Sequence, residues 1–248
     1  MNYKRMYVVV AALAAFLSAA PAAQAQPSVL DYRWSFDVGM GWDNSLSGNI
    51  NSGAIGNLDG QVTVITPNSY SDVYGTGYHL KFGGGYLIDE VSEVRAMFTY
   101  QSLSADLTAM GDYGVSNLYG QYDKYKSFGL DVGFRRYFDA SPAVRPYLEG
   151  TFGLGFITEI DVVLAAPAAN LTERATDFYD RTAAFALGGN VGVLWQVSNR
   201  VGAYGQIGLR WMSGLSEIDN LAGTGLETIN DDSSRWTLPI VVGMRVRF

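Results

Sequence analysis

The stretch that decides the fold is the last one in the chain, Arg235-Trp-Thr-Leu-Pro-Ile-Val-Val-Gly-Met-Arg-Val-Arg-Phe248. Every second residue from Trp236 to Phe248 is large and apolar, whereas the residues between them include arginine, threonine and glycine. An alternation with period two is the pattern of a β-strand whose two faces meet different surroundings. We therefore expect a strand with one strongly apolar face that ends at Phe248.

The same alternation occurs seven more times upstream. In the first of these segments, Trp34, Phe36 and Met40 lie on one face, and Asp37 and Gly39 lie on the other. Eight is an even number of strands, as bacterial single-chain barrels have. The expected strands cover about 32–43, 76–88, 93–103, 125–138, 147–157, 183–197, 200–212 and 235–248.

The connections between these segments are alternately short and long. The second, fourth and sixth segments are followed by short breaks, and the others by long ones. This pattern predicts an all-β fold, an eight-stranded antiparallel up-and-down transmembrane β-barrel with short periplasmic turns and four long extracellular loops. The loops are acidic and rich in glycine, serine and asparagine, with short strand extensions expected at 62–66 and 160–164.

The position of the bulky residues distinguishes this barrel from a soluble one. A soluble barrel of the lipocalin type buries its large apolar side chains inside. Here the opposite face carries the charges and many glycines, a poor filling for a dry core, so the apolar face is expected to meet lipid. Aromatic girdles should then form at both membrane interfaces, and the candidates are Trp34, Trp42, Tyr78, Tyr86, Tyr100, Phe138, Phe156, Trp195, Trp211 and Trp236.

The N-terminal segment predicts export. Lys4 and Arg5 precede an apolar run, and Ala23-Gln-Ala25 supplies small residues for cleavage, so 1–25 is expected to be a signal peptide and 26–248 the barrel domain. That domain holds 15 basic and 24 acidic residues, a net charge of −9, which argues against nucleic-acid binding. Because the chain has no cysteine, disulfides and thiol chemistry are excluded.

Three segments resemble the eight-stranded outer-membrane barrels of the opacity-protein and OmpA-transmembrane-domain type. They are Gly129-Leu-Asp-Val-Gly-Phe-Arg-Arg-Tyr-Phe138, Arg145-Pro-Tyr-Leu-Glu-Gly-Thr-Phe-Gly-Leu-Gly-Phe156 and the ending Gly243-Met-Arg-Val-Arg-Phe248. The resemblance covers 30–248 and specifies fold better than function. It implies a multi-pass monomer in the outer membrane of a Gram-negative bacterium, with both termini in the periplasm and outer-membrane lipid and lipopolysaccharide around it. It also implies that Phe248 is the signal read by the barrel-assembly machinery.

The inward-facing charges are the candidate site that physical arguments support best. An eight-stranded barrel is only wide enough for side chains to fill it, and an isolated buried charge is very unfavourable. We therefore expect a salt-bridge network in the lumen rather than an open channel. Its expected members are Asp37, His79, Lys81, Arg95, Asp131, Arg135, Glu149, Arg210 and Arg245, and Arg247 faces the same way.

Enzymatic chemistry finds little support in the sequence. His79 is the single histidine; it faces inward beside Lys81, and no serine stands at a matching offset. The acidic loops lack the spacing of a calcium-binding loop. We expect no catalytic residues, cofactor or metal, and a structural or surface-interaction role of the adhesin kind with an unknown ligand. A narrow, gated pore and a lipid-modifying enzyme are the alternatives.

Overall fold

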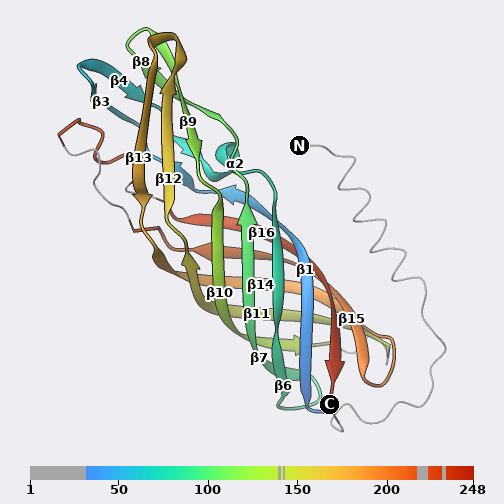
Figure 1. The fold of residues 1–248 in the computed structure, drawn as a ribbon. Coiled ribbons are helices and arrows are strands. Elements are labelled where there is room, and N and C mark those ends of the chain that lie inside the picture. Colours follow the sequence, from blue (N-terminus) through green and yellow to red (C-terminus); the bar gives the residue numbers. More distant parts are fainter. Residues whose placement is uncertain (1–31, 139–140, 142, 217–222, 231–232) are drawn as a thin grey trace.

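The computed structural model describes residues 32–138, 141, 143–216, 223–230 and 233–248. The proposed signal peptide therefore lies outside the described residues. Eight antiparallel strands form a closed barrel in the order β1-β16-β15-β14-β11-β10-β7-β6 (Figure 1). The strands are β1 (Trp34–Ser47), β6 (Gly77–Leu87), β7 (Ser92–Leu103), β10 (Tyr125–Tyr137), β11 (Val144–Ile157), β14 (Thr182–Gln196), β15 (Val201–Met212) and β16 (Arg235–Arg247).

The expected fold class is confirmed, and the strand boundaries differ only at the ends. β1 runs four residues beyond the expected 43, and β11 begins at Val144 rather than at 147. The barrel closes between the first and last strands, where the backbone groups of Trp34 and Phe248 exchange hydrogen bonds of 3.2 and 3.0 Å. Because these two strands are paired, neither remains an open edge.

The stagger of the strands follows from the register. The hydrogen-bonded partners that begin at Ser35 can be followed around the barrel, and the path returns to β1 at Ser45. A shift of ten residues at about 3.3 Å each, over eight strands about 4.8 Å apart, corresponds to a tilt of about 40°. This tilt lies in the range of membrane-spanning barrels.

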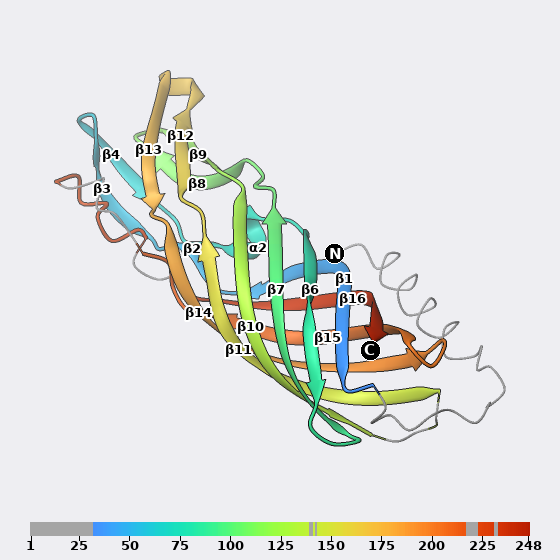
Figure 2. The same ribbon diagram turned by 60° about the horizontal axis from the view of Figure 1, so that its bottom comes forward.

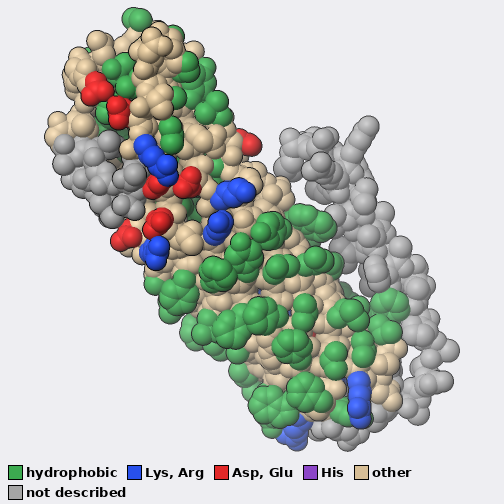
Figure 3. All heavy atoms as spheres, viewed as in Figure 1, with side chains coloured by type: hydrophobic (Ala, Val, Ile, Leu, Met, Phe, Trp, Pro, Cys, Tyr) green, Lys and Arg blue, Asp and Glu red, His purple; other side chains and the backbone are tan. Residues whose placement is uncertain are grey.

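Burial alternates along every barrel strand. In β1 the side chain of Met40 is 61% exposed, whereas that of Asp37 is fully buried. On the face in view the apolar residues form a broad band over the barrel, and the acidic residues lie above it (Figure 3). An apolar surface around a polar interior is the arrangement of a barrel that crosses an outer membrane. No helix within the described ranges is long and apolar enough to cross a membrane.

The long loops are more ordered than expected. The segments predicted at 62–66 and 160–164 correspond to β4 (Gln61–Ile65) and β12 (Ile160–Ala166), and the loops contain further strands that the sequence did not predict. All but the last loop contribute to a six-stranded sheet in the order β13-β12-β9-β8-β4-β3 (Figure 2). The added strands are β3 (Ala54–Leu58), β8 (Thr108–Tyr113), β9 (Ser116–Tyr122) and β13 (Leu171–Tyr179), and β2 (Asn49–Asn51) pairs with β5 (Asn68–Ser69).

The loop sheet is held by local turns and by a core of its own. Asp59 and Gly60 have φ of 49° and 80°, the left-handed pair that a tight turn of type I′ requires between β3 and β4. On the inner face Met110, Leu118 and Val162 are fully buried. They belong to one apolar cluster that continues into the loop end of the barrel.

A single helical turn, α2 (Tyr70–Val73), lies where the barrel meets the loops (Figure 1). Ser69 and Asp72 form a reciprocal capping box at its start, in which the Asp72 N–H donates to Ser69 Oγ at 3.3 Å and the Ser69 N–H to Asp72 Oδ2 at 2.9 Å. The Ser69 hydroxyl also donates to Asp72 Oδ2 at 2.6 Å. These hydrogen bonds hold the pKa of Asp72 below its usual value. A second short turn, η2 (Pro167–Ala169), connects β12 to β13.

Candidate functional site

The barrel interior contains a connected network of ion pairs. Asp37 and Arg245 face each other across β1 and β16, and Arg245 binds both carboxylate oxygens of Asp37 at 2.7 Å through Nε and Nη2. The remaining nitrogen of Arg245 lies 3.0 Å from Glu93 Oε2. Arg95 also contacts the Asp37 carboxylate. Two acids and two arginines from three strands therefore share one fully buried cluster.

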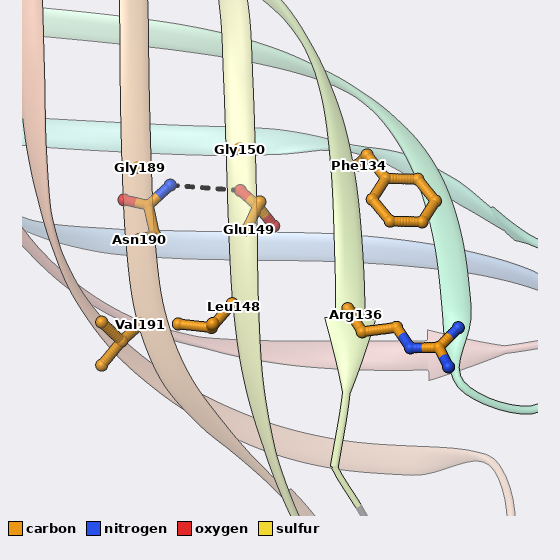
Figure 4. Close-up of a pocket in the computed structure, with 8 residues that line it drawn as sticks. All are labelled: Phe134, Arg136, Leu148, Glu149, Gly150, Gly189, Asn190 and Val191. Atoms are coloured by element: carbon orange, nitrogen blue, oxygen red, sulfur yellow. Dashed lines mark hydrogen bonds between the residues drawn. The ribbon is translucent and has the colours of Figure 1, made fainter.

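Glu149 is the second centre of the network. Its Oε2 accepts from Arg95 Nη1 at 2.6 Å and from Arg135 Nε at 2.7 Å. Its Oε1 lies 3.6 Å from Lys81 Nζ and accepts from Asn190 at 3.3 Å (Figure 4). Since Arg95 contacts both Asp37 and Glu149, the two centres are joined. Three cations thus share one buried carboxylate, which partly offsets their charge.

Asp131 and Arg210 form a separate pair nearer the loops. Arg210 Nη1 and Nη2 contact the two Asp131 oxygens at 2.7 and 2.9 Å, a bidentate geometry. His79 does not join the network. Its Nδ1 lies 4.0 Å from Asp43 Oδ2, and neither ring nitrogen has a hydrogen-bond partner. Of the nine residues expected to form the network, six are joined in it, Asp131 and Arg210 pair apart from it, and His79 makes no hydrogen bond within the described residues.

Several lumen residues escaped the sequence-based selection. Glu93 accepts from the Tyr137 hydroxyl at 2.6 Å, which connects this tyrosine to the network. Near the loops, Arg235 donates to Gln101 at 2.6 Å and stacks 4.0 Å from the Tyr125 ring. The alternation of inward and outward positions could have found them, since Glu93 stands two positions before the inward-facing Arg95 in the same strand.

The lumen carries a positive excess. The inward-facing charged residues of the described barrel strands are five acids and eight bases. Most of the excess lies at the two ends, where Arg247 and Arg235 each retain buried N–H groups that have no hydrogen-bond partner. The acids are Asp37, Asp43, Glu93, Asp131 and Glu149; the bases are Lys81, Arg95, Arg135, Arg145, Arg210, Arg235, Arg245 and Arg247.

An aromatic plug, formed by Tyr70, Tyr74 and Tyr125, packs at the loop end of the lumen. Tyr70 and Tyr74 come from α2 and the residue after it, and all three side chains are at most 2% exposed. Their rings contact one another at centroid distances of 6.0 to 6.4 Å. The Tyr70 hydroxyl donates to the carbonyl of Ser233, and that of Tyr74 to the carbonyl of Asp123, both at 3.0 Å. Burial raises the pKa of Tyr74 well above its usual value.

The loop sheet presents an outer face to solvent. Ile55 and Val62 point outward with exposures of 71% and 60%, and they lie on the same side as Val64 because Ile55 pairs directly with Val64. Further along the sheet this face carries Asp161 and Arg174, whose Nη2 and Oδ2 are 2.6 Å apart. The exposed apolar residues and the ion pair thus lie at opposite ends of the same outer face.

The girdle candidates lie on the outward face of the barrel. Trp42 pairs directly with Tyr78, and Trp211 with Trp236, at the loop end. At the other end Trp34 pairs with Tyr86, with ring centroids 4.8 Å apart. Tyr100, Phe138, Phe156 and Trp195 share the outward parity, and Phe248 is 63% exposed. The role of Phe248 in assembly stays a prediction.

The described residues contain no group of three or more His, Asp or Glu side chains that could hold a metal ion. No family model matches the chain, and no curated protein matches it.

Three solved structures are similar in fold to the chain. Neisserial surface protein A is 13% identical, covers 87% of this chain and 97% of its own, and has a TM-score of 0.45. The attachment invasion locus protein Ail of Yersinia pestis is 11% identical, with coverages of 86% and 99% and a TM-score of 0.36. The outer membrane protease OmpT of Escherichia coli is 9% identical. The match covers 92% of this chain and 99% of that protein, with a TM-score of 0.41. None of these likenesses assigns an activity to this chain.

Proposed function

We propose that this chain is a non-enzymatic surface-interaction protein of the outer membrane, with the loop sheet outside the cell and both ends of the described chain on the periplasmic side. The observation that carries the proposal is the loop sheet itself. Segments from three loops that are far apart in sequence pair into one sheet, and part of the fourth loop is hydrogen-bonded to it through Asn57 and Thr224. A platform with a buried core keeps its outer face in one shape, which lowers the entropy lost on binding.

The lumen supports a structural role for the barrel rather than transport. Four of its five acids form ion pairs with bases across the strands, and the aromatic plug packs at the loop end. His79 supports no lipid-directed chemistry, because its ring is buried inside the barrel and a lipid substrate would have to reach it through the wall. We therefore rank adhesion above a pore and above a lipid-modifying enzyme.

Whole-cell adherence tests the proposal. Cells that display the wild type should bind to epithelial monolayers or matrix-coated surfaces more than cells without it. The double variant Ile55→Thr, Val62→Thr should reduce this binding at least about threefold, because it removes two exposed apolar contacts of about 0.5 kcal/mol or more each. Leu107→Thr is the matched control, since Leu107 is 63% exposed but lies outside the sheet.

Surface amounts of all variants are compared by antibody labelling of intact cells. The labelling must first show that the loops of the wild type are exposed at the cell surface. Equal adherence of cells with and without the protein would then contradict the proposal and favour a purely structural role.

A further inference from the structure

A groove interrupts the lipid-facing surface where two glycines meet. Gly150 of β11 and Gly189 of β14 are directly paired, and both belong to the outward face. A Cβ added at either position would meet no atom within 4 Å. The outward neighbours are bulky, so the glycines leave a depression of about 410 Å³ beside Leu148 and Val191 (Figure 4).

Arg136 lies at the edge of the same groove and is a cation on the membrane-facing side, and its guanidinium extends away from the two glycines toward β7 (Figure 4). Arg136 pairs with Leu148 across β10 and β11. The next pair on the outward face, two residues along, is Phe134 with Gly150, so Arg136 lies about 7 Å along the strand from the glycines. Its side chain is 52% exposed, and Nη1 donates to Ser92 Oγ at 2.6 Å. Asp89 is 3.9 Å away on the adjoining turn. The exposed part of the guanidinium remains available for an anion.

The charges around Arg136 indicate which kind of anion it binds. The outward positions of the described barrel strands carry no aspartate or glutamate. A second copy packed on this face through its strands would thus offer Arg136 no carboxylate. A lipid phosphate at the membrane interface is the anion available in that plane, and guanidinium groups bind phosphate with paired hydrogen bonds.

We propose that the groove is a binding site for one glycerophospholipid of the periplasmic leaflet. The phosphate contacts Arg136 near the turn end of β10, and an acyl chain lies over Gly150 and Gly189. The leaflet follows from the proposed orientation, in which the short turns are periplasmic. The lipid site itself is independent of what the loops bind, so it can fail or hold separately from the adhesion proposal.

Native mass spectrometry of the refolded full-length mature barrel, with phosphatidylglycerol added to the detergent, tests the site. The wild type should retain one phospholipid. Gly150→Leu with Gly189→Leu should lower its occupancy about tenfold, because the added side chains take the place of the acyl chain. Arg136→Gln should lower it by a similar factor through loss of the phosphate contact.

Two matched controls separate the site from general effects. Ala96→Leu places a leucine at an outward position outside the groove, and Lys126→Gln removes the outward cation at the opposite end of β10. Both should retain the lipid, and heat-modifiable migration on a gel checks that every variant is folded. Unchanged occupancy in the glycine or Arg136 variants would overturn the proposal. So would equal retention of diacylglycerol, selective retention of lipid A, or a protein dimer that the glycine variants abolish.

Discussion

At the scale of single residues, the lumen shows what the alternation of side chains predicts and what it cannot predict. Parity placed Asp37, Arg95, Glu149 and Arg245 on the inward face, and the structure has all four there. Parity could not say which acid meets which base, because partners such as Asp37 and Arg245 are 208 positions apart in the chain. Their pairing depends on barrel closure, which brings the first and last strands together.

Replacement of Glu149 by glutamine tests the network. The change leaves Arg95, Arg135 and Lys81 around a neutral group, so three buried cations lose their shared counter-charge. We expect the free energy of unfolding to fall by about 3–5 kcal/mol, measured by urea titration of the refolded protein. Glu159→Gln is the control, because the Glu159–Arg181 pair is exposed and should contribute less than about 1 kcal/mol. Equal effects of the two changes would show that the lumen pairs are not coupled.

At the scale of elements, the barrel strands and the loop strands differ in predictability. The barrel strands are long enough for a period of two to be read with certainty, and β1 alone has 14 residues. The loop strands β3 and β4 have five residues each. Runs this short are ambiguous by periodicity, and β4 pairs with β8 from a different loop. The loop sheet therefore depends on contacts that no local pattern records.

The turn at Asp59 and Gly60 allows a test of one loop element. Gly60→Val should destabilise the β3–β4 hairpin by about 1–2 kcal/mol, because a side chain at a φ of 80° clashes with the backbone. Amide hydrogen exchange should accelerate in β3 and β4 while the barrel strands keep their protection. Gly75→Val is the matched control, since Gly75 has no positive φ and open space around it. If Gly60→Val left the exchange of β3 and β4 unchanged, the turn would not restrain the hairpin.

At the scale of the whole molecule, side chains from the barrel wall and from one loop lie in the lumen. A stagger of ten residues over eight strands makes a narrow cylinder, which the ion pairs and the aromatic plug share. Residues 48–76 supply the plug from one loop, and β10 supplies Tyr125 from the wall. We therefore expect the lumen to be closed, with barrel and loops both contributing.

Planar-bilayer recordings test this closure. The refolded wild type should give no stable conductance steps, since ions would have to displace the paired charges and the tyrosines. Tyr70→Ser with Tyr74→Ser removes two rings of the plug and should increase ion leakage, and the peripheral variant Leu107→Thr should stay silent. Steady anion-selective steps from the wild type would instead support the pore alternative, consistent with the excess of lumen arginine.

The sequence by itself determined the number of barrel strands, their approximate spans and which face of each meets lipid. These features follow from the alternation of side chains, which is local to each strand and needs no knowledge of its neighbours. The tertiary structure decided the stagger, the partners of Asp37 and Glu149, the loop sheet and the groove at Gly150 and Gly189. Each of these depends on the register between segments distant in the chain, and a shift of register changes every contact without changing the alternation.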